Sequence, residues 1–266
     1  MGQTEAPEWL LAVWSRALVE AGSRAPQGEI SRLGAKLIER WANPARRFHG
    51  IGHLITVLEK IDELSQEASC PCLVRLAAFY HGAVLTAVAP PGPRAWTEDE
   101  AASAALAQGQ LRHLELPEPR TERVYRLITG LGARPEPVAD PDLGVLCDAE
   151  RAILAADPRA YRAYAEALRA ECGDGAPEAI LESRIGVLRA WLGKDRLFVT
   201  SSTAAWEDAA RNNIEAELAR AARELAALGA PALHPSAGLS SAVAAHGSLS
   251  ASGTVPFRAQ TTFADQ

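Results

Sequence analysis

The chain has 266 residues, of which 48% are hydrophobic and 23% charged, as in ordinary globular proteins that bury a core without disulfides. Its 33 acidic and 27 basic side chains give a formal net charge of −6. This excess of negative charge argues against a general nucleic-acid-binding protein, which normally presents a basic surface. We therefore expect no nucleic-acid partner.

The N-terminal residues are acidic and amphipathic, and they lack the basic segment and the cleavage site of a signal peptide. The longest apolar stretch, residues 76–89, contains a histidine and a glycine and is too short to cross a bilayer. These features predict a cytoplasmic protein with no membrane partner.

Apolar residues recur at helical spacing along most of the chain. Asp157-Pro158 has the features of a helix start, because an N-cap carboxylate precedes a proline at the first helical position. No segment shows a clear strand-like alternation, although residues 196–200 are short and ambiguous, so the predicted fold class is all-α. The expected helices cover residues 9–18, 30–41, 54–64, 73–85, 101–111, 124–131, 148–156, 158–171, 177–192 and 203–228.

The composition changes near Gly229. The residues that follow are rich in Ser, Ala, Gly and Pro and carry almost no charge or periodicity, so they cannot bury enough apolar surface to offset the entropy of ordering. We expect a single all-α domain over residues 1–229 and a disordered tail over residues 230–266.

The four cysteines are Cys70, Cys72, Cys147 and Cys172. The spacing of Cys70-Pro71-Cys72 fits neither a zinc knuckle nor a thioredoxin-type pair, and no second pair accompanies it. We expect reduced, partly buried thiols.

Three histidines are candidates for a polar site. His49 and His53 are four residues apart and would share one helix face, whereas His81 lies in an apolar run where an unpaired imidazole is costly. Neutral imidazole is a common ligand of divalent metals. Spacing alone leaves two interpretations: an internal metal site, or a His81 that hydrogen-bonds a backbone carbonyl while His49 and His53 cap a surface.

Several motifs follow one another along the chain. Trp41 precedes Arg-Phe-His-Gly-Ile-Gly-His at residues 47–53, and further elements lie at residues 77–83, 98–104, 148–154 and 207–218. In this order they resemble the motifs of the HD superfamily of metal-dependent phosphohydrolases, in particular a branch of bacterial predicted HD phosphohydrolases. The resemblance extends over about residues 7–228 and implies a helical bundle of the HD type.

The resemblance also implies roles for individual residues. His53, His81 and Asp148 would bind one divalent metal ion, and His49 or Glu100 would transfer a proton. The implied substrate is a small phosphorylated molecule or a nucleotide.

The sequence departs from the family pattern at Gly82, where the family has the aspartate that gives the HD motif its name. Two histidines and one carboxylate remain, so we expect the ion to be weakly bound or absent and hydrolysis to be weakened or lost. Two alternatives stay open: an active mononuclear phosphohydrolase and a non-catalytic helical binding protein. We expect Gly82→Asp to raise metal affinity and not to harm the fold through helix propensity alone. Tight metal binding in the wild type would instead mean that another residue, for which Glu100 is the candidate, replaces the lost carboxylate.

Overall fold

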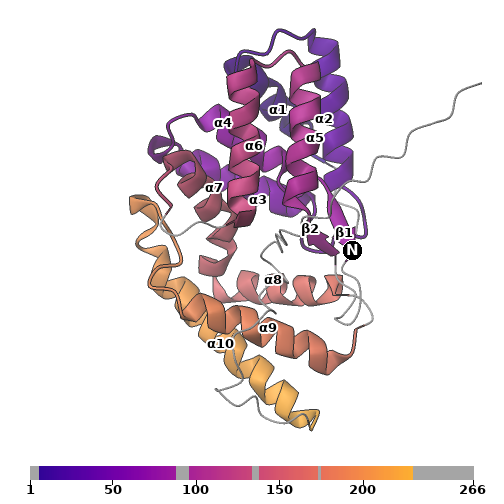
Figure 1. Cartoon of the computed structure of the whole chain (residues 1–266). Helices are drawn as coiled ribbons and strands as arrows, with labels where there is room; N and C mark the ends of the chain where they lie inside the picture. Colours follow the sequence, from indigo (N-terminus) through magenta and orange to yellow (C-terminus); the bar gives the residue numbers. More distant parts are fainter. Residues whose placement is uncertain (1–5, 88–95, 134–137, 173–174, 230–266) are drawn as a thin grey trace, which may run out of the picture.

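The computed structural model describes residues 6–87, 96–133, 138–172 and 175–229, and in these ranges the chain is predominantly helical (Figure 1). The predicted all-α fold class is therefore confirmed. The prediction of a disordered tail over residues 230–266 lies outside the described residues. Within the described part of the chain, none of the helices combines the length and the apolar composition that crossing a bilayer requires.

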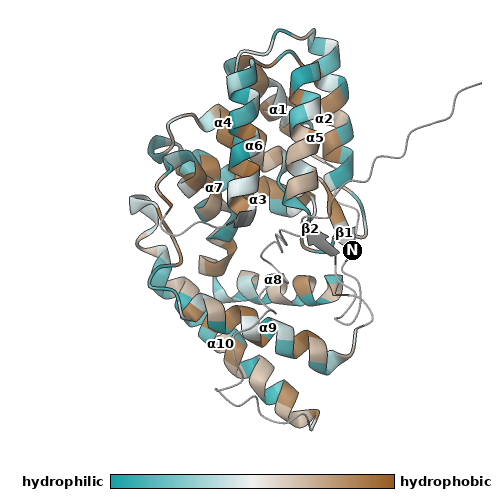
Figure 2. Ribbon diagram, in the orientation of Figure 1, coloured by the Kyte–Doolittle hydropathy of each residue, from teal (hydrophilic) through white to brown (hydrophobic). Residues whose placement is uncertain are grey.

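The N-terminal helices pack around one continuous apolar cluster, to which α1 through α7 all contribute. Figure 2 shows apolar residues on the sides of these helices that face one another and hydrophilic residues on their outer sides. The elements of this part are α1 (Glu8–Glu20), α2 (Gln27–Trp41), α3 (Ile51–Glu63), η1 (Ser65–Glu67), α4 (Pro71–Tyr80), α5 (Glu100–His113), α6 (Glu118–Ala133) and α7 (Pro141–Arg151).

A short β-ribbon lies between α4 and α5 in the chain. Strands β1 (Leu85–Ala87) and β2 (Trp96–Glu98) are antiparallel, and Leu85 pairs with Glu98. The helix expected over residues 73–85 is therefore too long, because α4 ends at Tyr80 and Leu85 belongs to a strand. Gly82 favours this ending, since glycine lowers helix stability by about 1 kcal/mol relative to alanine.

The C-terminal helices form a second layer, which crosses the lower end of the bundle in Figure 1. A separate apolar cluster lies among these elements. They are η2 (Ala152–Ala155), α8 (Pro158–Glu171), α9 (Pro177–Leu192), η3 (Ser201–Thr203) and α10 (Trp206–Ala227).

Two helices begin at aspartate–proline pairs. The side chain of Asp157 accepts hydrogen bonds from the backbone N–H groups of Arg159 and Ala160, as the sequence predicted for the start of α8. Asp140 caps α7 in the same way, before Pro141. Both caps satisfy N–H groups that a helix leaves unpaired, and the missing N–H of proline costs nothing at the first helical position.

Candidate metal site

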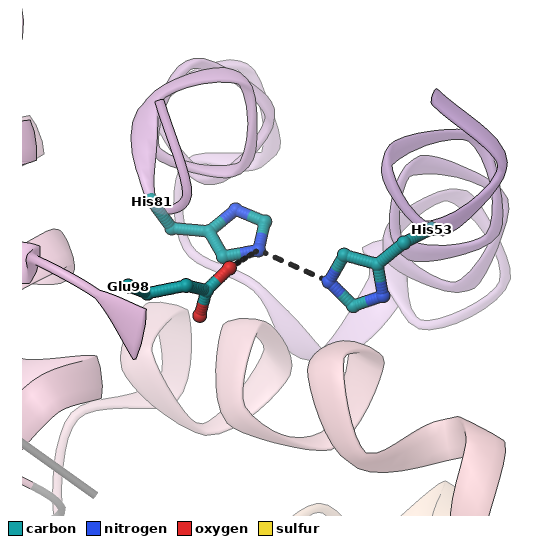
Figure 3. Close-up of side chains that lie close together, drawn as sticks. All are labelled: His53, His81 and Glu98. Atoms are coloured by element: carbon teal, nitrogen blue, oxygen red, sulfur yellow. Dashed lines mark hydrogen bonds and ion pairs between the residues drawn. The ribbon is translucent and has the colours of Figure 1, made fainter. Parts of the chain in front are cut away.

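Three side chains from separate elements converge inside the bundle. His53 lies on α3, His81 directly follows the last residue of α4, and Glu98 ends β2. One ligand atom from each lies within 4.8 Å of the other two, and Figure 3 shows the three side chains pointing toward one another. Among the described residues this His/Glu cluster has the donor set to hold a metal ion.

The hydrogen bond of His81 determines which ring nitrogen faces the cluster as an acceptor. Its Nδ1 lies 2.6 Å from the carbonyl oxygen of Ala78. Because a carbonyl only accepts, Nδ1 carries the proton and donates it, so that in the neutral form of the ring the Nε2 lone pair is directed at His53 and Glu98. Metal-binding histidines commonly donate their second ring N–H to a backbone carbonyl in this way.

The separation of the two imidazoles fits a shared ion. Nε2 of His53 and Nε2 of His81 are 3.3 Å apart. Two Zn–N bonds of 2.0–2.1 Å at a tetrahedral angle would place their nitrogens about 3.3–3.4 Å apart. The spacing is therefore that of two adjacent ligands, and it is also within hydrogen-bonding distance, so one Nε2 can donate to the other.

Glu98 occupies the space that a side chain at position 82 would need. Its Oε1 lies 3.7 Å from Nε2 of His81. A Cβ built on Gly82 would lie 2.3 Å from this same oxygen. Glycine at position 82 therefore leaves room for a carboxylate from β2 to approach His81.

Trp41 and Arg46 hold the backbone around Gly82. The indole N–H of Trp41 donates to the carbonyl oxygen of Phe79 at 2.9 Å, and Cη2 of this ring would lie 2.6 Å from a Cβ at position 82. Arg46 lies over the Trp41 ring and donates to the carbonyl oxygens of Gly82, at 2.6 Å, and Ala83, at 3.3 Å. Its guanidinium thus fixes the turn between α4 and β1.

The protonation of His53 suits metal binding. Burial lowers the pKa of His53 well below its ordinary value, and the neighbouring His81 lowers it further. The ring is therefore neutral at pH 7, which is the form that binds a metal.

His49 lies beside the cluster without joining it. Its ring centroid is 5.7 Å from that of His53, and its Nδ1 lies 2.6 Å from Oε2 of Glu171 at the end of α8. Burial lowers the pKa of His49, but the hydrogen bond to Glu171 and the charge of Glu98 outweigh it, so the net shift is upward. Glu171 also accepts from the backbone N–H groups of Phe48 and His49, which ties α8 to the segment before α3.

Glu100 takes a place at the start of α5 rather than in the His/Glu cluster. Its side-chain carbons lie against Gly132 of α6, where a Cβ would meet them at 3.1 Å. An acidic residue in the first turn of a helix is also favoured by the helix dipole. The carboxylate that approaches the histidines is that of Glu98, two residues earlier.

Asp148 is fully buried, and the described His/Glu cluster does not include it. Its two oxygens accept hydrogen bonds from residues 199 and 200, in a segment whose secondary structure the sequence left ambiguous, and from Thr203 of η3. The donors are Val199 N, at 2.8 and 3.0 Å, Thr200 N, at 2.7 Å, Thr200 Oγ1, at 2.8 Å, and Thr203 Oγ1, at 3.1 Å. This geometry gives Asp148 a structural role that the resemblance did not imply.

We expect Asp148→Asn to destabilise the protein by about 3 kcal/mol, because buried donors then face an amide in place of a carboxylate. Urea unfolding of this variant would measure the loss, and Asp195→Asn, at an exposed position of the same segment, is the matched control. A stable Asp148→Asn variant that no longer binds zinc would instead make Asp148 a metal ligand.

The sequence therefore identified two of the three clustered residues, His53 and His81, and missed Glu98. A signal was present, because Gly82 lacks a carboxylate and residues 98–100 are all acidic. Which of these three acidic side chains reaches the histidines depends on where β2 ends and α5 begins.

Comparison with known protein families, curated proteins and solved structures gives no match for this chain. Function is therefore inferred from the chemistry of the His53–His81–Glu98 cluster and from the motifs in the sequence.

Proposed function

We propose that the protein is a metal-dependent phosphohydrolase that binds one divalent ion through His53, His81 and Glu98. The observation that carries the proposal is the 3.3 Å separation of the two Nε2 atoms, with Glu98 beside them. Two histidines and one glutamate form a ligand set of catalytic zinc sites, in which a fourth position stays open. The phosphoester substrate follows from the resemblance to HD phosphohydrolases.

The metal would supply a Lewis acid, which lowers the pKa of water and polarises a phosphoryl oxygen. Glu98 provides negative charge against the cation, and the two histidines provide neutral donors. His49, held by Glu171 and shifted toward its protonated form, is placed to give a proton to a leaving group. Glu171 acts through His49 and is a positioning residue.

A second candidate function is a closed metal site that stabilises the fold without catalysis. The observation in its favour is the burial of the cluster, since His81 is 0% exposed, His53 7%, and the Glu98 side chain 14%. Structural zinc sites are closed in this sense, whereas catalytic sites admit water and substrate.

Zinc titration of the metal-free protein, followed by assays with phosphomonoesters and nucleotides, tests the catalytic and the structural function. We expect one Zn²⁺ per chain and metal-dependent phosphate release, both of which disappear in His53→Gln. Stoichiometric zinc that raises the melting temperature without any turnover would favour the closed structural site. A chain that binds no divalent ion would contradict both functions.

A further inference from the structure

A pair of thiols lies at the start of α4, on the other end of this helix from His81. Sγ of Cys70 and Sγ of Cys72 are 3.4 Å apart, and neither is in a disulfide. We propose that Cys70 and Cys72 form a reversible dithiol–disulfide site that reacts with low-molecular-weight disulfides such as oxidised glutathione.

The backbone holds the two sulfurs in contact. Pro71 between them restricts the chain, and the backbone N–H of Cys70 donates to Oδ1 of Asp142 at 2.8 Å. Asp142 is fixed in turn by Arg123, whose Nη2 donates to Oδ2 at 2.7 Å. Closing the pair requires the sulfurs to approach from 3.4 Å to the ~2.05 Å of a disulfide.

The two thiols differ in exposure, which assigns them different roles. Cys70 is partly exposed at the N-cap position of α4, where a disulfide in solution can reach its sulfur. Cys72 is buried, and burial followed by its hydrogen bond with Cys70 raises the pKa of its thiol to about 12. Cys70 is therefore the attacking sulfur, and Cys72 is the resolving one.

The reaction is two thiol–disulfide exchanges. The Cys70 thiolate attacks one sulfur of oxidised glutathione, forms a mixed disulfide and releases one glutathione thiolate. Cys72 then gives its proton to water, and its thiolate attacks Sγ of Cys70 and expels the second glutathione thiolate. The two protein thiols lose two electrons and two protons, and oxidised glutathione is reduced to two thiols.

Mass spectrometry of the native protein after incubation with oxidised glutathione tests the proposal. Trypsin releases residues 61–75, which contain these two cysteines and no other. We expect this peptide to become about 2 Da lighter, to lose both alkylatable thiols and to regain them with dithiothreitol. Cys72→Ala is expected to keep one glutathione on Cys70, Cys70→Ala to leave Cys72 reduced, and the control Cys172→Ala to behave as wild type.

Three results would contradict the proposal. These are a glutathione that stays on Cys70 in the wild-type protein, a peptide 61–75 that stays reduced, and modification of Cys172 before Cys70. Because peptides of the wild-type protein distinguish these cases, the test does not depend on the folding of any variant. It is also independent of the metal site, so failure of either proposal leaves the other standing.

Discussion

Glu98→Gln is expected to lower the zinc affinity by at least about 100-fold, because loss of a residue that only supports a metal ligand already costs 10–100-fold. The substitution keeps the shape of the side chain and removes the charge that approaches His81. A competition titration with a chromophoric chelator would measure the change. If the ion is catalytic, phosphate release falls with the same dependence on zinc.

Glu63→Gln is the matched control for this variant. Glu63 ends α3, the helix that carries His53, and its side chain is about half exposed and paired with Lys60. We expect it to bind zinc as the wild-type protein does. Wild-type affinity in Glu98→Gln, together with loss of zinc in a folded Asp148→Asn variant, would restore the ligand set implied by the resemblance.

Gly82→Asp is expected to destabilise the protein and to weaken zinc binding. The contacts at Gly82 thus reverse the expectation drawn from the sequence. Any Cβ here lies 2.3 Å from Oε1 of Glu98 and 2.6 Å from the ring of Trp41, which is fully buried and hydrogen-bonded. Overpacking of this kind costs about 1–3 kcal/mol. The added aspartate also displaces Glu98 from His81 and brings two carboxylates together.

A double-mutant cycle separates these effects. In Gly82→Asp combined with Glu98→Gly, the contact with Oε1 is gone and the aspartate can take the place of the glutamate. We expect this double variant to be more stable, and to bind zinc more tightly, than Gly82→Asp alone, with a coupling of about 0.5–3 kcal/mol between the positions. Tighter zinc binding in Gly82→Asp alone would contradict the expected displacement of Glu98 from His81.

Local patterns in the sequence were sufficient for the helical fold. The period of apolar residues identifies a helix wherever one face packs against a core, and Asp157-Pro158 marks the start of α8 through contacts with its own backbone. The β-ribbon gave no such signal, because strands of three residues are too short to show an alternation.

The two histidines of the site were also identifiable from the sequence. His81 stands in an apolar run where its imidazole requires a partner, and His53 belongs to a motif that resembles a known one. Residue type and position in a helix therefore determined which side chains face the interior of the bundle.

Only the tertiary structure decided which carboxylate meets these histidines. Asp148 and Glu98 are both acidic residues within the motifs of the sequence. The carboxylate of Asp148, however, accepts hydrogen bonds from backbone N–H groups of a loop about 50 residues away in the chain. Glu98 reaches His81 because β2 pairs with β1 and because Gly82 leaves room for its oxygen. The hydrogen bonds of Asp148 and the position of Glu98 both depend on contacts between segments that are distant in the chain. A local sequence pattern carries no information about such contacts.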